Sequence, residues 1–356
     1  MPMIRDENVL WLRLLRSRIT DPVTTYEAYD QLFQMMSPIP TDYWITPGTA
    51  PFLQHRAAFD DTAYNFRLRA KRAIVKGRFQ KNGIGYVRFD ELPLFAAIYK
   101  KEPDHMGPLE WKFYDLLNHE GPMTIGMIKE LTGMYVKDIT PVLHKLQSAF
   151  IVFEDQKDND WERSWYLIEN EFPEVDLQQW TMDSALRTAF VRFVTMNVFA
   201  DAGMARSFYN IPAKRAEEVF LALVEDGIAV PALFDGRSGY VMAKDLEILE
   251  GPERKIKPSV YAINRNDFLV RSNEHLLKNA PGTAASGTMY HLLIDGKFQG
   301  TVEGGFKFGP HVVENVRVDL PEAEALARKV EILDAVAVVL DPEQSAPKRY
   351  NGVERT

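Results

Sequence analysis

The same order of segments occurs three times in the 356-residue sequence. In each copy, segments with apolar residues at helical spacing come first, and two segments with alternating apolar residues follow around a polar turn. Helices followed by a two-stranded hairpin are the parts of a winged helix. A strand-rich segment then closes the chain. The sequence therefore predicts an α+β fold of three tandem winged-helix units followed by a small C-terminal β-barrel-like domain.

The first copy occupies residues 1–104. Its alternating segments AIVKGRFQ and IGYVRF flank KNG, which is a hairpin turn signal. Asp90 is placed to cap the helix that follows this hairpin. Helices are predicted over residues 7–19, 24–36, 61–72 and 90–101.

The remaining units are predicted in the same way. The second copy occupies residues 105–178, and its strands AFIVFED and SWYLIEN enclose a polar loop. The third occupies residues 179–251 and begins with a long helix over 182–203. Residues 258–342, which carry many β-branched and aromatic residues with DG and GG turns, predict a small β-barrel or a curled sheet closed by a helix. The last residues, QSAPKRYNGVERT, are expected to be a loose end.

The composition excludes several kinds of site. The chain has no cysteine, so it can form no disulfide, thiolate zinc site or cysteine nucleophile. It has no run of about 18 apolar residues that would span a membrane. Metal-protease, nucleotide-loop and dinucleotide fingerprints are also missing from the sequence. We therefore expect a cytoplasmic monomer that uses no metal and no organic cofactor.

Positive charge gathers near the beginning of the chain. Residues 1–101 hold 15 Lys and Arg against 10 Asp and Glu, whereas residues 102–356 hold 27 against 40. Seven of the basic residues lie in the stretch RLRAKRAIVKGRFQK, at 67–81. This segregation suggests a polyanionic partner on one face. The alternative is that these side chains are the solvated sides of a helix and of a strand.

Two stretches resemble a known family. KRAIVKGRFQKNGIGYVRFDELPLFAAIYKK is similar to the hairpin and helix of the AlkZ/YcaQ family of winged-helix DNA glycosylases. DFLVRSNEHLLK, followed by YHLLIDGKFQGTVEGG, resembles the closing β-domain of that family, and the order of parts agrees over nearly the whole chain. The resemblance implies three tandem winged helices in a C shape, a β-barrel, and removal of alkylated or crosslinked bases from DNA.

The catalytic signature of that family is altered here. The family usually has Gln, one other residue and then Gln or Asp after the second helix, often in a stretch resembling QADPI. The counterpart is MMSPI, at 35–39, in which Met35 falls at the Gln position and Ser37 at the Gln or Asp position. Shifting the register by one residue places Gln34 first but loses the second polar group. Gly85 is nearest to the position of the frequent hairpin histidine of the family.

Chemistry defines what a replacement must supply. Cleavage of an N-glycosidic bond develops positive charge on the sugar, so an anionic or accepting group must stabilise it and orient a water. Asp42 is the only acid in or beside the loop, and Tyr43 and Trp44 offer faces on which a displaced base can stack. The alternatives are a turn role for Asp42 and a core role for Trp44. The candidates for catalysis are Gln34, Ser37, Thr41 and Asp42.

These observations lead to one hypothesis and two alternatives. We expect a monofunctional DNA glycosylase that binds double-stranded DNA and removes a bulky, alkylated, crosslinked or otherwise modified base by water attack. The alternatives are a non-catalytic winged-helix DNA-binding regulator and a protein-interaction scaffold. Phosphate contacts are predicted for Arg67, Arg69, Lys71, Arg72, Lys76, Arg78 and Lys81, with Arg237 at the tip of a later hairpin.

Overall fold

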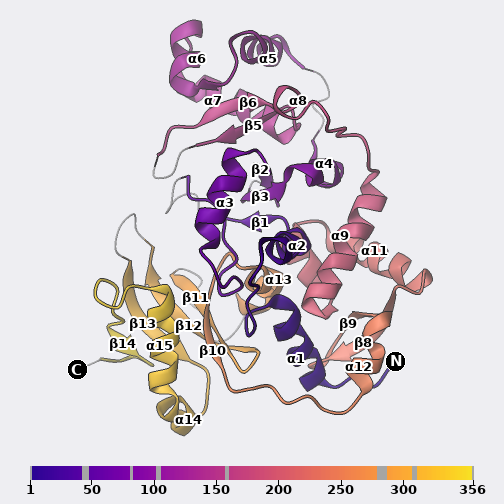
Figure 1. Cartoon of the computed structure of the whole chain (residues 1–356), viewed down its shortest axis with the longest axis vertical. Helices are drawn as coiled ribbons and strands as arrows, with labels where there is room; N and C mark the ends of the chain where they lie inside the picture. Colours follow the sequence, from indigo (N-terminus) through magenta and orange to yellow (C-terminus); the bar gives the residue numbers. More distant parts are fainter. Residues whose placement is uncertain are drawn as a thin grey trace. The chain divides into compact units, whose positions relative to one another are not determined.

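The chain forms two compact units in a computed structural model (Figure 1). Unit 1 comprises Met1–Tyr29, Leu53–Ala58 and Phe190–Thr356, and unit 2 comprises Asp30–Phe52 and Phe59–Ala189. Within these bounds the structure describes residues 2–41, 48–80, 83–101, 106–156, 160–278, 287–306 and 311–354.

Unit 2 contains the first two copies of the helix–hairpin pattern, which we call repeats 1 and 2. Repeat 1 pairs its three strands in the order β1-β3-β2, and repeat 2 in the order β4-β6-β5. The elements of repeat 1 are α2 (Tyr26–Met36, in unit 2 from Asp30), β1 (Ile39–Pro40), α3 (Asp61–Ala70), β2 (Ile74–Phe79), β3 (Gly83–Arg88), η1 (Phe89–Glu91) and α4 (Leu92–Tyr99). Those of repeat 2 are α5 (Pro108–Glu120), β4 (Met123–Thr124), α6 (Ile125–Thr132), α7 (Val136–Ser148), β5 (Val152–Asp155), β6 (Ser164–Leu167) and α8 (Ile168–Glu171).

Repeat 3 lies in unit 1, apart from the first half of its long helix, and pairs its strands in the order β7-β9-β8. The three repeats thus share one topology, in which a short strand between helices adds to the hairpin. The elements of repeat 3 are α9 (Met182–Asn197), β7 (Phe199–Ala200), α10 (Ala202–Tyr209), α11 (Ala213–Glu225), β8 (Ala229–Phe234), β9 (Arg237–Met242), η2 (Ala243–Asp245) and α12 (Leu246–Glu250).

The C-terminal part of unit 1 is a six-stranded sheet with helices. In the described part of this domain the strand order runs from β10 at one edge to β15 at the other, which is the order of an open sheet. Ile332 and Val336 of α15 belong to its buried core together with Ala262 and Leu292. Its elements are β10 (Val260–Asn264), α13 (Phe268–Leu277), β11 (Thr288–Ile294), β12 (Lys297–Gly305), β13 (Val312–Val318), α14 (Glu322–Ala327), α15 (Lys329–Val339), β14 (Arg349–Tyr350) and β15 (Val353–Glu354).

The predicted α+β class is confirmed, and the chain's last residues correct a detail. The expected loose end supplies β14 and β15. Tyr350 is buried and donates its hydroxyl proton to the carbonyl of Ala325 at 2.7 Å, and the Asn351 side chain accepts from the Val318 amide. Residues beyond 342 therefore belong to the C-terminal domain. None of the helices in the described ranges is long and apolar enough to cross a membrane.

The first helix, α1 (Asp6–Ser17), contacts elements of repeat 3. It belongs to unit 1, where Arg16 forms a two-pronged ion pair with Asp245 at 2.6 Å. Asn8 is fully buried, and its amide donates to carbonyls at the end of α12, including that of Ile248 at 3.0 Å. The last carbonyls of a helix lack intrahelical donors, so Asn8 satisfies groups that would otherwise be orphaned. A helix predicted to belong to residues 1–104 thus packs on repeat 3.

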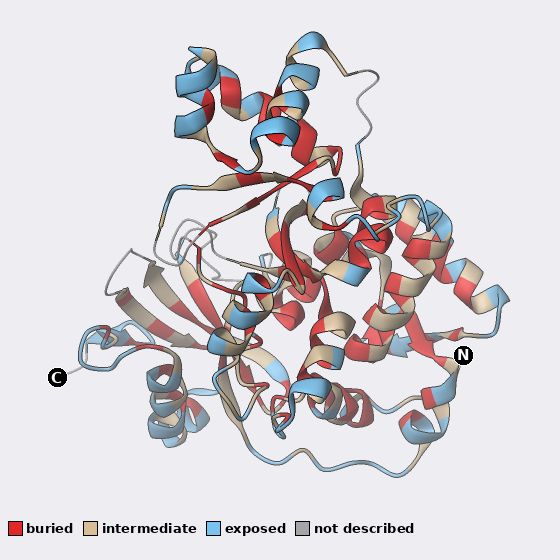
Figure 2. Cartoon of the chain, turned by 45° about the horizontal axis from the view of Figure 1, so that its top comes forward, coloured by how far each residue is buried: buried red, intermediate tan, exposed pale blue. Residues whose placement is uncertain are grey.

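A short segment, Leu53–Ala58, docks on the C-terminal sheet within unit 1. Gln54 accepts from the Asn264 amide at 2.8 Å, and the His55 Nε2 lies 3.0 Å from the Ala262 carbonyl oxygen. Arg56 has no exposed area and forms a two-pronged ion pair with Asp267, with nitrogen–oxygen distances of 2.5 and 2.9 Å. Figure 2 shows the buried residues along the strands and on the inward sides of the helices.

The Arg56–Asp267 pair gives a test of this docking. We expect Arg56→Ala to lower the free energy of unfolding by about 3–5 kcal/mol, because it leaves the Asp267 carboxylate buried without its counter-charge. Urea denaturation measures this. The exposed pair Lys348–Glu314, at 2.8 Å, is the control, and Lys348→Ala should change stability by less than about 1 kcal/mol. Equal effects of the two substitutions would contradict the assignment.

Candidate functional site

The candidate catalytic loop begins where α2 ends. The Ser37 hydroxyl donates to the Phe33 carbonyl at 2.8 Å, and its side chain is buried. A cis peptide bond joins Ser37 to Pro38, and the next two residues form β1 along the edge of the hairpin. Ser37 therefore uses its donor inside the helix end. Asp42, Tyr43 and Trp44, which were predicted to act here, lie outside the described residues.

The β1 strand explains the glycine in the hairpin. Gly85 pairs with Pro40, and a Cβ atom at residue 85 would lie 3.1 Å from the Ile39 carbonyl oxygen. The Thr41 amide donates to the Ile84 carbonyl at 3.1 Å on the same edge. A histidine side chain at position 85 would thus press against the β1 backbone. The β1 backbone therefore occupies the space that a side chain would need at residue 85, the position nearest to the family's histidine.

A buried carboxylate that sequence reasoning missed lies beside the loop. Gln34 donates from Nε2 to Glu91 Oε1 at 3.1 Å, and Glu91 is 4% exposed. The sequence suggested that Asp90 caps the following helix, but α4 begins at Leu92, and Asp90 accepts from Arg88 at 3.1 Å instead. Glu91 is 57 residues from Gln34 in sequence. The sheet of repeat 1 brings the two together.

Helix α3 holds the other end of the loop. Asn65 is buried and donates to the Pro51 carbonyl at 2.8 Å, and Arg69 donates to the Gly48 carbonyl. The Tyr86 hydroxyl accepts from Arg69 at 3.4 Å, and burial raises the pKa of Tyr86 to about 12, against the opposing effect of the Arg69 charge. Arg69, which was predicted to contact phosphate, thus points inward and positions the loop backbone.

Other basic side chains of repeat 1 pair with acids of repeat 2. Arg72 donates to Asp155 at 2.5 Å and to Glu171 at 3.0 Å. Lys76 is 3% exposed and lies 3.5 Å from Glu154, which has no exposed area. These contacts tie β2 to β5 within unit 2. Part of the positive charge of residues 67–81 is therefore balanced by the acidic surplus that follows it in sequence.

Lys76 and Glu154 form the buried pair at the centre of this network. Burial tends to raise the pKa of Glu154, but Lys76 and Arg163 hold it below its usual value. Burial lowers the pKa of Lys76, and the Glu154 charge opposes that shift. Arg163 adds a second contact to Glu154 at 2.7 Å. The phosphate contact predicted for Lys76 conflicts with this geometry, because its ammonium is enclosed by protein.

The remaining predicted phosphate contacts have different surroundings. Arg67 and Lys71 are exposed, and the Arg67 guanidinium lies over the Tyr64 ring at 5.7 Å. Arg78 donates to Gln147 at 2.8 Å and lies partly buried against α7. Arg237, in unit 1, pairs with Asp201 at 2.9 Å, and Lys81 lies outside the described residues. The phosphate role of Arg67 and Lys71 stays a prediction.

No cluster of metal-ligand side chains occurs in the ranges that the structure describes. The arrangement at the loop instead offers amide and carboxylate oxygens, Gln34 and Glu91. Such groups can orient a water and stabilise positive charge. Arg67 and Lys71 remain the exposed cations for which contacts to an anionic backbone are predicted.

His144 supplies a pH-dependent feature of unit 2. Its Nε2 lies 3.0 Å from an Arg78 guanidinium nitrogen, so this ring nitrogen acts as an acceptor. Burial and the Arg78 charge lower the pKa of His144 from 6.5 to about 4. Between pH 6.5 and about pH 4, His144 is therefore protonated in the unfolded chain but not in the folded chain. The free energy of unfolding falls as the pH falls through this range.

We expect His144→Gln to reduce the loss of melting temperature between pH 7 and pH 4.5, because glutamine can accept from Arg78 and does not titrate. Thermal unfolding followed by circular dichroism over that pH range measures the slope. The exposed His119, whose Nδ1 lies 2.7 Å from the Asp115 carbonyl oxygen, is the control. A shallower slope in His119→Gln than in His144→Gln would refute the assignment.

Comparison with known proteins places this geometry in a recognised fold. No family model matches the sequence, and no curated protein matches it. Among solved structures, the chain is similar to the DNA glycosylase AlkZ from Streptomyces sahachiroi, with a TM-score of 0.68 and 14% sequence identity. The alignment covers 98% of this chain and 100% of that chain. The protein therefore has the fold of an AlkZ-type DNA glycosylase along nearly its whole length.

Proposed function

We propose that the protein binds duplex DNA and hydrolyses the N-glycosidic bond of a bulky or modified base. The observation that carries the proposal is the match to the AlkZ fold over 98% of the chain. The match includes both units and the C-terminal sheet, so it extends beyond a single DNA-binding module. Fold alone does not fix activity, so the proposed chemistry depends on individual residues in and beside the candidate loop.

The Gln34–Glu91 pair gives the loop a polar group that can act on water. Glu91 accepts from the Gln34 nitrogen at 3.1 Å and so fixes the amide orientation. The amide oxygen of Gln34 is then left to accept a hydrogen bond from the attacking water. In this scheme Glu91 is a positioning residue, and Gln34 orients the nucleophile.

Asp42 completes the proposed mechanism. Asp42 is the acidic residue within the loop sequence. We assign two roles to its carboxylate, which are to stabilise positive charge on the sugar and to remove a proton from the attacking water. Water attack forms the new carbon–oxygen bond as the bond from sugar to base breaks, and the base leaves with the electron pair. Tyr43 and Trp44 are proposed to stack on the displaced base.

A second candidate function is supported by the position of Ser37. This residue stands where the resemblance expects Gln or Asp, yet its hydroxyl is used by the Phe33 carbonyl. A protein with this loop can retain the fold and bind DNA without releasing a base. Such a non-catalytic DNA-binding protein would share the phosphate contacts and lack the chemistry.

Base release separates the two candidates. We expect the protein to free a base from at least one of a panel of alkylated, crosslinked and bulky modified-pyrimidine duplexes, detected by mass spectrometry. Asp42→Asn and Glu91→Gln should each lower the rate by about 10²–10⁴-fold, as expected for loss of acid–base catalysis or its positioning. Asp115→Asn, an exposed acid of α5, is the control. DNA binding without release from any duplex would favour the non-catalytic candidate.

Charge replacement tests which cations meet DNA. Arg67→Glu with Lys71→Glu should weaken duplex binding and reduce the steepness of the negative slope of log K against log salt by about 0.9 for each lost phosphate contact. Lys76→Met should leave that slope unchanged but lower the free energy of unfolding by about 3–5 kcal/mol, because Glu154 loses a buried partner. Fluorescence anisotropy over a salt series measures the slopes. A lower slope for Lys76→Met alone would place the DNA against β2 instead.

A further inference from the structure

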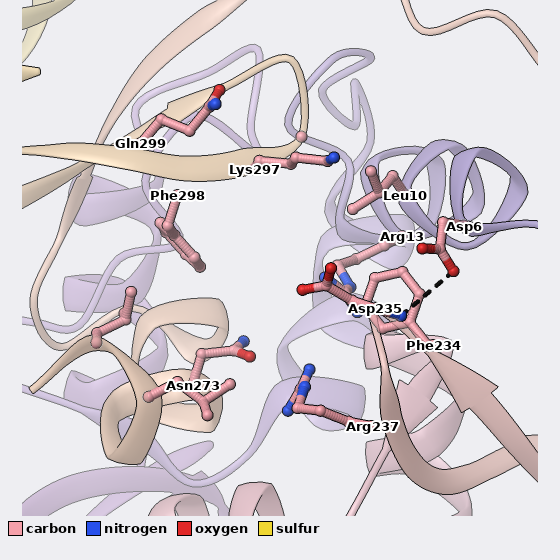
Figure 3. Close-up of a pocket in the computed structure, with 13 residues that line it drawn as sticks. Asp6, Leu10, Arg13, Phe234, Asp235, Arg237, Asn273, Lys297, Phe298 and Gln299 are labelled. Carbon is pink, nitrogen blue, oxygen red and sulfur yellow. Dashed lines mark hydrogen bonds between the residues drawn. The ribbon is translucent and has the colours of Figure 1, made fainter. Parts of the chain in front are cut away.

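A cavity in unit 1 lies outside the candidate catalytic loop and is independent of the proposed function. Its volume is about 260 Å³, and it is lined by parts of α1, the β8–β9 turn, α13 and the β11–β12 turn (Figure 3). These four elements are distant in sequence but belong to one compact unit. Pockets for drug-sized ligands have volumes of about 300–1,000 Å³, so this cavity suits a smaller molecule.

Arg13 brings an incompletely satisfied cation to the cavity. Its side chain is 8% exposed, Nε donates to the Asn197 carbonyl at 2.8 Å, and the guanidinium lies over the Phe234 ring at 5.2 Å. The Nη2 atom is buried and has no hydrogen-bond acceptor among the residues that the structure describes. A buried guanidinium group with unused donors is costly unless something accepts from it.

A second guanidinium faces the same space. Arg237 lines the cavity and points into it in Figure 3, while one of its nitrogens donates to Asp201 at 2.9 Å. Burial and the nearby Arg237 charge lower the pKa of Arg13 to about 10, partly opposed by Asp235. Two like charges thus line one small cavity. An anion between them would reduce this repulsion and use the remaining donors.

The carboxylates of the cavity do not take that position. Asp6 accepts from the backbone amide of Asp235 at 3.3 Å, as drawn in Figure 3. In the described part of the chain, neither Asp6 nor Asp235 forms an ion pair with Arg13. Lys297 adds a third cation on the β11–β12 turn. The cavity therefore holds three cationic and two anionic side chains.

The rest of the wall is apolar. Phe298 points into the cavity from β12, and Leu10 and Leu276 line it from two helices. Asn273 directs its amide into the same space. An apolar wall with a few convergent polar groups is the usual composition of a site for a small organic molecule.

We propose that this cavity binds a small organic anion. Its carboxylate or phosphate group lies between Arg13 and Arg237, and its apolar body lies against Phe298. Guanidinium groups suit this task because their planar donor arrangement matches both anionic groups in a two-pronged contact. The enclosure of Arg13 favours a small molecule over the phosphate of a polymer, because a buried donor is reached only by a group that enters the cavity.

Titration calorimetry on the full chain tests the proposal with three probes of similar size. Benzoate and phenyl phosphate carry the two anionic groups, and benzyl alcohol is the neutral comparison. We expect saturable binding of at least one anion, at least tenfold tighter than benzyl alcohol. The preferred probe then shows whether the site takes a carboxylate or a phosphate.

Substitutions locate the site. Arg237→Ala should weaken binding of the preferred anion by at least tenfold, and Lys297→Ala, at an exposed position, should weaken it by a smaller factor without risk to the fold. Arg215→Ala is the matched control, because Arg215 lies in the same unit and is ion-paired to Glu218 at 3.1 Å but does not line the cavity. Its dissociation constant should equal that of the unmodified protein.

Three outcomes would overturn the proposal. One is the absence of saturable binding by either anion at millimolar concentration. Another is unchanged affinity in both Arg237→Ala and Lys297→Ala proteins that melt like the unmodified chain. The third is loss of duplex DNA binding in Arg237→Ala with no binding of either small anion, which would make the residue a contact to the DNA backbone. Base release has no part in these measurements, so failure of the glycosylase proposal is distinguished from failure of this one.

Discussion

The Glu154 carboxylate is enclosed by protein, and Lys76 and Arg163 both form ion pairs with it. Removing either charge of a buried pair is strongly unfavourable, so this contact fixes β2 of repeat 1 against β5 of repeat 2. The hairpin that contains β2 also pairs through β3 with β1, and β1 leads out of α2 into the candidate loop. The geometry of the loop therefore depends on an ion pair that lies away from it.

The ion pairs of this network involve several of the cations in residues 67–81. Seven cations in fifteen residues suggest a surface for phosphate, but Arg69, Arg72, Lys76 and Arg78 each contact groups inside unit 2. Arg67 and Lys71 are exposed, and the predicted contact to a polyanion is therefore kept as a proposal for these two residues. A cluster of like charges in sequence can thus serve two purposes, because alternate residues of a strand and successive turns of a helix face different surroundings.

The candidate loop shows a similar division. Its serine is used by the helix end, while a glutamine one turn earlier meets a buried glutamate from the segment after the hairpin. The two polar side chains of the Gln34–Glu91 contact therefore come from two parts of repeat 1. The cavity at Arg13 is assembled in the same manner from four elements of unit 1. In both places, nothing in the sequence indicates that these side chains lie together, and the tertiary structure brings them into one site.

The order of helices and hairpins was readable from the sequence, because the spacing of apolar residues is a local property with periods of 3.6 and 2. The α+β class and the resemblance to the AlkZ/YcaQ family followed from that order and from two stretches of sequence. Tertiary structure decided four other features, which are the position of α1 on repeat 3, the Arg56–Asp267 pair, the strands β14 and β15, and the Gln34–Glu91 contact. Each joins residues far apart in the chain, and a local pattern carries no information on which distant partner will satisfy a buried charge or an unpaired backbone group.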